Sequence, residues 1–229
     1  MFVMKRLLIY ILLLFVVSIG QAQERKIQKF KISTIEDFFR FENVDQLCSY
    51  FGKENIFTEK TFYQKPESGG KAYLVSQVNF GTPKAVLVIW SGDGKLLCGV
   101  QSSAYFFDYK AQKKRLMPNN WKTKQGLASG MKLSELVKVN WFAIKFKTHT
   151  GKANYGDLFP GFGWLKFKRS VSFLPEKLIY EYTLDLKKRN EYFPTLSSLT
   201  LNSNDKLVRK WNPMLEMISI YREGMKPIN

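Results

Sequence analysis

The stretch Gly126-Leu127-Ala128-Ser129-Gly130-Met131-Lys132-Leu133-Ser134-Glu135-Leu136-Val137-Lys138-Val139-Asn140 organises the chain. Two glycines bound a loop that leads into a short amphipathic helix, because Leu133, Leu136 and Val137 recur at the spacing of one helical face. Glu135 falls in the first turn of this helix, where a carboxylate stabilises the free main-chain amides. We therefore expect a structural helix here, with strands before and after it.

A second helix of the same pattern lies earlier in the chain. It follows the cap residue Asn43 and ends before Gly52, the residue type most often found just past a helix end. Residues 44–52 align with residues 133–141, apolar on apolar at four positions. Each stretch precedes a run of strand-like segments. Either the chain contains two related units, or two generic amphipathic helices align by chance.

These patterns predict an α+β fold, in which short helices pack on one face of an antiparallel sheet. We expect two tandem helix-then-sheet units, residues 23–110 and 121–222, followed by a tail at 223–229. One core shared by both units is an open alternative. A further helix start is expected at Ser33-Thr34-Ile35-Glu36, where a hydroxyl and a carboxylate fit a capping box.

Alternating apolar and polar residues place the strands, and Ser91-Gly92-Asp93-Gly94 is typical of a hairpin turn. Three segments, 110–120, 151–163 and 202–206, are expected to be loops or turns because they are basic, glycine-rich or polar. The expected strands are 58–64, 72–80, 85–90, 96–100, 103–109, 142–148, 164–173, 178–186, 198–201 and 217–221.

The first residues predict export. Lys5 and Arg6 precede an unbroken apolar run, residues 7–17, and small residues follow at a spacing that suits cleavage. We expect a signal peptide over residues 1–22, with cleavage after Gly20 as the alternative. The apolar run is shorter than the ~20 residues that span a bilayer, and an uncleaved anchor is the competing interpretation.

The expected location is therefore the periplasm or the extracellular space of a Gram-negative cell. No cysteine follows the apolar run closely, since the first is Cys48. A lipid-anchored lipoprotein is not expected, and neither is a stable membrane span after cleavage.

The charge is strongly positive, with a formal net charge of +17. The excess lies in residues 71–229, while residues 23–70 are balanced. An exported protein with this charge would attract anionic lipids or polysaccharide rather than nucleic acid. Lysine on solvated faces would give the same excess without any partner.

Two lysine-aromatic alternations occur, Ile144-Lys145-Phe146-Lys147 and Leu165-Lys166-Phe167-Lys168-Arg169. On adjacent strands, they would line up a cationic strip for an anionic partner, made of Lys145, Lys147, Lys166 and Lys168. The same alternation also arises on any half-buried sheet, with lysine outward and the apolar residue inward. Lysine on such strands additionally discourages edge-to-edge pairing.

The tryptophans and cysteines give further expectations. Trp121 and Trp141 flank the 126–140 stretch and are candidates for an exposed aromatic patch. Cys48 and Cys98 would meet an oxidising compartment after export. They form either one disulfide that closes a loop of about 50 residues or two buried thiols.

No catalytic or metal-binding pattern is present in the sequence. His149 is the only histidine, no nucleophile-elbow motif accompanies it, and two distant cysteines with one histidine do not make a zinc site. Gly161-Phe162-Gly163 lacks the third glycine of a dinucleotide fingerprint. We expect no cofactor and no enzymatic activity. A hydrolase with scattered carboxylates is the least favoured class, because such pairs leave no local signature.

A family resemblance rests on a series of short motifs. They are Trp90, Trp121-Lys122-Thr123, Gly126-Leu127, Gly130-Met131-Lys132-Leu133-Ser134-Glu135-Leu136, Asn140 and Gly161-Phe162-Gly163-Trp164. In this order they resemble a family of exported bacterial proteins of unknown role, built from tandem units similar to the β-lactamase inhibitor protein. The resemblance covers about residues 75–170 and implies a fold and an envelope location, without any catalytic residue.

The chain departs from that family at two places. Asn140 is followed by Trp141 where the family tends to have glycine. Gly163-Trp164 is followed by Leu165-Lys166 where the family tends to have an acidic and an aromatic residue. A family function carried by these positions would be altered in this chain.

The sequence therefore predicts a non-enzymatic interaction module of the cell envelope with a basic sheet face. Its partner would be an anionic envelope component or another protein. A periplasmic carrier of a small apolar or lipid ligand is the alternative.

Overall fold

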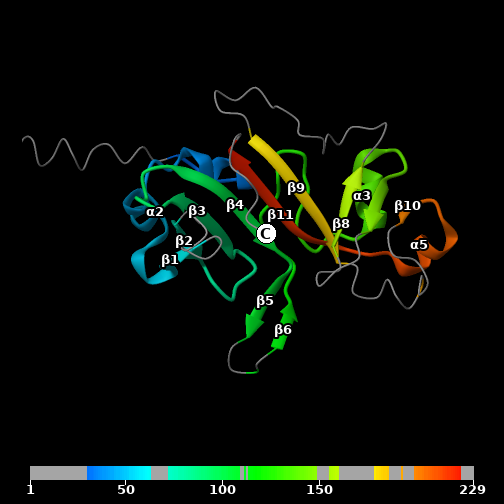
Figure 1. Ribbon diagram of the computed structural model, residues 1–229, viewed down its shortest axis with the longest axis horizontal. Helices are drawn as coiled ribbons and strands as arrows, with labels where there is room; N and C mark the ends of the chain where they lie inside the picture. Colours follow the sequence, from blue (N-terminus) through cyan, green and yellow to red (C-terminus); the bar gives the residue numbers. More distant parts are fainter. Residues whose placement is uncertain are drawn as a thin grey trace, which may run out of the picture. The chain divides into compact units, whose positions relative to one another are not determined.

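The structure is a computed structural model that describes residues 30–62, 72–108, 111, 113–148, 155–159, 178–185, 192 and 199–222. The architecture below is that of the unit Ile32–Asn229. Within the described residues, the strands form one nine-stranded antiparallel sheet and one two-stranded ladder, accompanied by short helices (Figure 1). The α+β class expected from the sequence is confirmed.

The large sheet has the strand order β1-β2-β3-β4-β11-β9-β8-β7-β10. A separate ladder pairs β5 (Tyr105–Asp108) with β6 (Lys113–Leu116). The strands of the large sheet are β1 (Ile56–Phe62), β2 (Ala72–Val78), β3 (Val86–Ser91), β4 (Leu97–Ser103), β7 (Lys145–Thr148), β8 (Tyr155–Phe159), β9 (Leu178–Asp185), β10 (Thr200–Asn202) and β11 (Leu215–Arg222).

Two runs of strands build the sheet and meet at its centre. Helix α2 (Val44–Phe51) precedes β1, β2, β3 and β4, which follow one another from one edge inward. Helix α3 (Leu133–Asn140) precedes β7, β8, β9 and β11, which progress inward from the other side, where β10 adds the edge strand. Antiparallel pairing of β4 with β11 joins the two runs. In chain order, each of these two helices thus precedes a run of strands, and both runs belong to one sheet.

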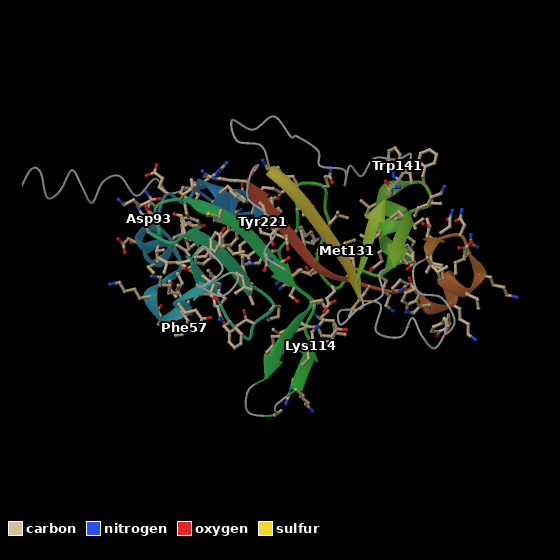
Figure 2. All side chains as sticks on the ribbon, viewed as in Figure 1. Phe57, Asp93, Lys114, Met131, Trp141 and Tyr221 are labelled. Carbon is tan, nitrogen blue, oxygen red and sulfur yellow. The ribbon has the colours of Figure 1, made fainter. Side chains whose placement is uncertain are left out.

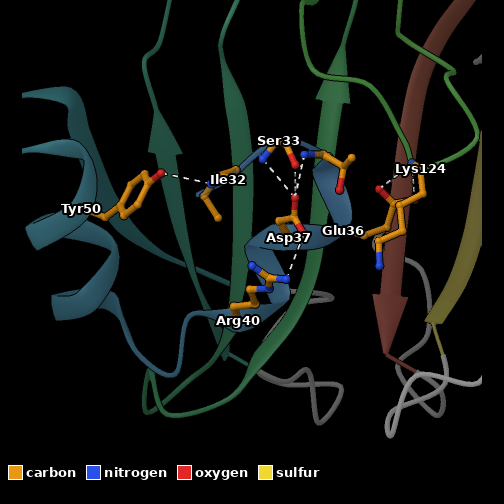
Figure 3. Close-up of polar contacts among 8 residues, drawn as sticks. Ile32, Ser33, Glu36, Asp37, Arg40, Tyr50 and Lys124 are labelled. Carbon is orange, nitrogen blue, oxygen red and sulfur yellow. Dashed lines mark hydrogen bonds and ion pairs between the residues drawn. The ribbon is translucent and has the colours of Figure 1, made fainter. Parts of the chain in front are cut away.

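The first described helix, η1 (Ile35–Arg40), is a 3₁₀ helix held by one carboxylate. The Asp37 Oδ2 atom accepts hydrogen bonds from the main-chain N–H of Thr34 at 2.9 Å and of Ser33 at 3.0 Å, and from the Ser33 hydroxyl at 2.9 Å (Figure 3). The predicted helix start is therefore correct, but the carboxylate of the capping arrangement is that of Asp37. Glu36 is engaged elsewhere.

Helix α2 begins and ends where the sequence predicts. The Asn43 Oδ1 atom accepts the main-chain N–H of Gln46 at 2.9 Å, which satisfies an amide of the first turn. Gly52 follows the helix with φ 85°, a conformation that glycine adopts without a steric penalty. An aromatic cluster joins α2 to η1, since Phe51 stacks on Phe38 with ring centroids 5.6 Å apart.

One face of the sheet is buried. Helix η1 packs against β4 on this face, and the Ser129 hydroxyl of the loop before α3 lies 2.9 Å from that of Ser102 on β4. The Trp90 Nε1 atom donates to the Ser76 hydroxyl at 3.1 Å, so both buried polar groups are satisfied. The register places these core residues side by side: Ser76, Val78, Val86, Val88, Trp90, Val100, Ser102, Ile218 and Ile220.

The opposite face carries a smaller apolar cluster at the centre of the sheet. Ile89, Cys98 and Tyr221 are buried there, and Tyr73 packs against them. The ring of Tyr221 lies directly over Gly99. A Cβ atom added at Gly99 would be only 2.6 Å from Tyr221 Cδ1. The absence of a side chain on β4 thus makes room for an aromatic ring from β11.

Two strands and two short helices were not expected from the sequence, and one of these helices is the 3₁₀ helix η2 (Lys53–Asn55). β6 lies in the predicted loop 110–120, β8 lies in the predicted glycine-rich loop, and helix α5 (Lys206–Trp211) follows the predicted turn. The four residues of β6 are all exposed, and they form a strand because they pair with β5. Strand β8 is paired on both sides, with β7 and with β9. Partner strands override local propensity here. A helix of six residues is too short to show a periodicity.

The remaining predictions agree with the structure or lie outside it. Strands β2, β3, β4, β5, β9, β10 and β11 occur within a few residues of their expected bounds, and β1 begins two residues early. The strand expected at 142–148 is shorter, because β7 begins only at Lys145 and leaves Phe142 outside the strand. The predicted strand 164–173, the tail 223–229 and the signal peptide lie outside the described residues. Among the described helices, none has the length and the hydropathy needed to cross a bilayer.

Candidate functional site

The end of α3 exposes two adjacent aromatic side chains. Leu133, Leu136 and Asn140 are buried on the inner side of this helix. Trp141 follows the helix and is 79% exposed, and Phe142 is 57% exposed. Trp141 extends away from the ribbon at the end of α3 (Figure 2). We name Trp141 and Phe142 the aromatic pair.

The main chain on both sides of the aromatic pair is fixed by hydrogen bonds. The buried Asn140 side chain donates from Nδ2 to the carbonyl of Phe142 at 3.1 Å. The N–H of Ile144 donates to the Ser203 hydroxyl, and its carbonyl accepts the N–H of Ser203, both at 2.9 Å. Because Asn140 and Ile144 are anchored, the segment between them projects from the fold as a defined turn.

Trp141 holds a left-handed backbone conformation, with φ 64° and ψ −10°. This region is unfavourable for any residue with a Cβ atom, by about 1–2 kcal/mol, and glycine is the usual occupant. The indole makes no hydrogen bond and no ring contact with another described residue. The position therefore costs stability locally, and nothing in the described structure offsets that cost.

Lysines flank the aromatic pair along the chain. Lys138 lies one helical turn before Trp141, Lys145 follows Phe142 by three residues, and both are exposed. Glu135, the acidic residue of α3, accepts the main-chain N–H of Lys132 at 2.7 Å. Its carboxylate has the structural role at the helix start that the sequence predicts.

The predicted lysine strip is described only in part. Lys145 is exposed while Ile144 and Phe146 are fully buried, so the alternation is confirmed at these positions. β7 pairs with β8 on one side and with β10 on the other, so both its neighbours differ from the predicted strand at 164–173. Lys166, Lys168 and the side chain of Lys147 lie outside the described residues.

Trp121 does not form the predicted exposed aromatic patch with Trp141. Its ring packs edge-on against Phe38 with centroids 5.2 Å apart, and its Nε1 atom donates to the carbonyl of Lys84 at 2.9 Å. Trp121 is therefore a half-buried packing residue, and Phe142, which the sequence reasoning missed, stands beside Trp141. The doublet of large aromatic residues directly after a helix end was the available signal.

The two cysteines are separate thiols. Cys98 is buried in the apolar cluster with Ile89 and Tyr221, while Cys48 on α2 is partly exposed. Burial, and then the nearby Asp45 carboxylate, raise the pKa of the Cys48 thiol. Of the two expected states, the structure therefore shows two thiols and not a disulfide.

The described part of the chain offers little for catalysis or metal binding. No three His, Cys, Asp or Glu side chains within it are grouped around a common point, and His149 lies outside it. An open hollow of about 280 Å³ is lined by Phe57, Glu59, Gln77 and Phe80, and this volume is below the roughly 300–1,000 Å³ of typical ligand pockets.

Comparison of the chain with protein-family models, with curated proteins and with solved structures gives no match.

Proposed function

We propose that the protein is a non-enzymatic binding module of the cell envelope and that the end of α3 is its contact surface. The observation that carries this proposal is the exposure of Trp141 and Phe142 on a turn held by hydrogen bonds. Trp is enriched at the centres of binding interfaces, because it contributes a large apolar area at a small entropic cost.

The backbone of Trp141 supports the same proposal. A left-handed tryptophan destabilises the fold, and strained residues that persist often lie at functional positions. Glycine would satisfy the turn without strain, and the resemblance noted in the sequence also has glycine at this place. A contact made by the indole would explain why this chain has tryptophan there.

The envelope location rests on the sequence of the first 22 residues and on the resemblance. The excess of basic residues and the exposed Lys138 and Lys145 suit a partner with negative charge. The module needs no catalytic group for this role.

Photo-crosslinking from position 141 tests the proposal. Trp141 is replaced with benzoylphenylalanine in cells that express the protein, and Leu207, a 47% exposed residue on α5, is replaced in the same way as the matched control. Irradiation should give a discrete adduct from position 141 and none from position 207. Absence of an adduct at 141, or identical adducts at both positions, would contradict the proposal.

A further inference from the structure

We infer that the partner of the aromatic pair is the surface of an anionic lipid bilayer, which Trp141 and Phe142 enter at headgroup depth. This inference rests on the contact surface proposed above and names what covers it.

The aromatic pair is too small for a stable protein interface. Such interfaces bury roughly 800 Å² on each partner and involve 20–30 residues a side. Here two consecutive side chains protrude from a helix end. The other large apolar side chains that are exposed in the described residues lie on different elements: Tyr50, Phe57, Phe80, Leu96, Leu116 and Leu207. A bilayer demands no complementary shape, so two protruding rings are sufficient for it.

The charges beside the aromatic pair suit an anionic surface. Lys138 and Lys145 precede and follow the pair, and both are exposed. The nearest acidic residue on α3, Glu135, is engaged by the main-chain N–H of Lys132. Each lysine close to an anionic membrane strengthens binding by about fivefold, and this contribution falls with salt.

The chemistry of the pair suits the boundary between water and lipid. Trp is concentrated at both interfaces of membrane proteins, because its ring is apolar and its N–H is polar. The Trp141 N–H has no partner among the described residues and is free to bond a headgroup oxygen. Phe142 supplies an entirely apolar ring beside it. Buried apolar area and attraction to anionic lipids both contribute to binding at a membrane surface, and the aromatic pair and its flanking lysines supply one of each.

Vesicle sedimentation tests the inference. Protein purified from the exported fraction is mixed with vesicles of phosphatidylglycerol and phosphatidylcholine, or of phosphatidylcholine alone, at two salt concentrations. The wild-type protein should sediment with the anionic vesicles, more weakly at high salt. The double variant Trp141→Ala/Phe142→Ala should bind at least tenfold more weakly at unchanged net charge, whereas the control Leu207→Ala should bind as the wild type does.

A matched charge pair separates the two contributions. Lys138→Glu/Lys145→Glu should weaken binding to anionic vesicles more than tenfold. The same reversal on α5, Lys206→Glu/Lys210→Glu, changes the net charge equally and should have a smaller effect. If both reversals act equally, or if the aromatic double variant binds like the wild type, the contact is unspecific attraction of a basic protein and the inference is overturned.

Fluorescence identifies the residue that enters the lipid. Anionic vesicles should shift the tryptophan emission of the wild type to shorter wavelength. Trp141→Phe should keep most of the binding and lose most of that shift, because the other tryptophans stay in the protein. An unchanged shift in Trp141→Phe would contradict insertion at this position.

The crosslink from position 141 tests the contact surface and the bilayer separately. A lipid adduct at position 141 supports both the contact surface and the bilayer. A protein adduct would keep the contact surface and overturn the bilayer. No adduct would remove both.

Discussion

The main-chain N–H of Lys124 donates to both carboxylate oxygens of Glu36, at 2.9 and 3.0 Å (Figure 3). This contact joins η1 to the segment that leads into the loop before α3. Glu36 is only 4% exposed, so its carboxylate is held largely out of water by the residues it connects.

The two neighbouring acids of η1 therefore titrate in opposite directions. Burial raises the pKa of Glu36 above its ordinary value of 4.5, although the hydrogen bond from Lys124 opposes this. Burial would also raise the pKa of Asp37, but hydrogen bonds from Ser33 and Thr34 outweigh it and lower the pKa below 3.8.

We expect Glu36→Gln to remove one part of the pH dependence of stability. An acid whose pKa is raised on folding makes the fold less stable as pH rises from its unfolded pKa to the raised value. Urea unfolding should therefore show the wild type losing stability relative to Glu36→Gln in the window above pH 4.5. If the difference in unfolding free energy between the two proteins stays constant across that window, the pKa of Glu36 is not raised by folding.

Asp37→Asn is the internal control for that measurement. Because the pKa of Asp37 is lowered, its stabilising contribution is present above pH 3.8 and is lost as pH falls below that value. The wild type should accordingly be more stable than Asp37→Asn at neutral pH, and the difference should shrink only in the acid range.

Gly99→Ala should destabilise the centre of the sheet. The new Cβ atom would be 2.6 Å from Tyr221 Cδ1 and 3.2 Å from the carbonyl oxygen of Ile220. Overpacking of this kind typically costs about 1–3 kcal/mol, measurable by urea unfolding. The double variant Gly99→Ala/Tyr221→Leu should lose less unfolding free energy than the two single variants lose together, because removing the ring relieves the clash. Full additivity would show that the ring does not cover Gly99.

Trp141→Gly should stabilise the fold while it weakens binding. Glycine removes a left-handed strain of about 1–2 kcal/mol but gains freedom in the unfolded chain, so the net gain is up to about 1 kcal/mol. Trp141→Ala keeps the Cβ atom and serves as the control, with a stability close to that of the wild type. Equal stabilities of the glycine and alanine variants would argue against the strained turn.

The thiols should differ in reactivity. In the native protein, a thiol reagent should modify the partly exposed Cys48 slowly at neutral pH, because burial and Asp45 raise its thiol pKa. Cys98 should react only after unfolding, and a reductant should leave the melting temperature unchanged. Denatured, unreduced protein that contains no reactive thiol would instead demonstrate a disulfide.

Local sequence rules determined the elements whose signals are contained in a few consecutive residues. Asn43 and Gly52 define α2 because a cap residue and a glycine act on the amides and carbonyls next to them. The alternation at Ile144, Lys145 and Phe146 shows in the structure for the same reason: the two faces of a strand are set by its own period. The α+β class follows from the sum of such signals.

Tertiary structure decided the rest. β6 and β8 are strands because β5, β7 and β9 pair with them, although their own residues favour a loop. Likewise, Trp121 and Trp141 flank the same stretch and were predicted to be alike. Phe38 and Lys84, distant in sequence, cover Trp121, whereas no described residue covers Trp141. Burial depends on which distant residues approach a side chain, and that information is absent from the residues beside it.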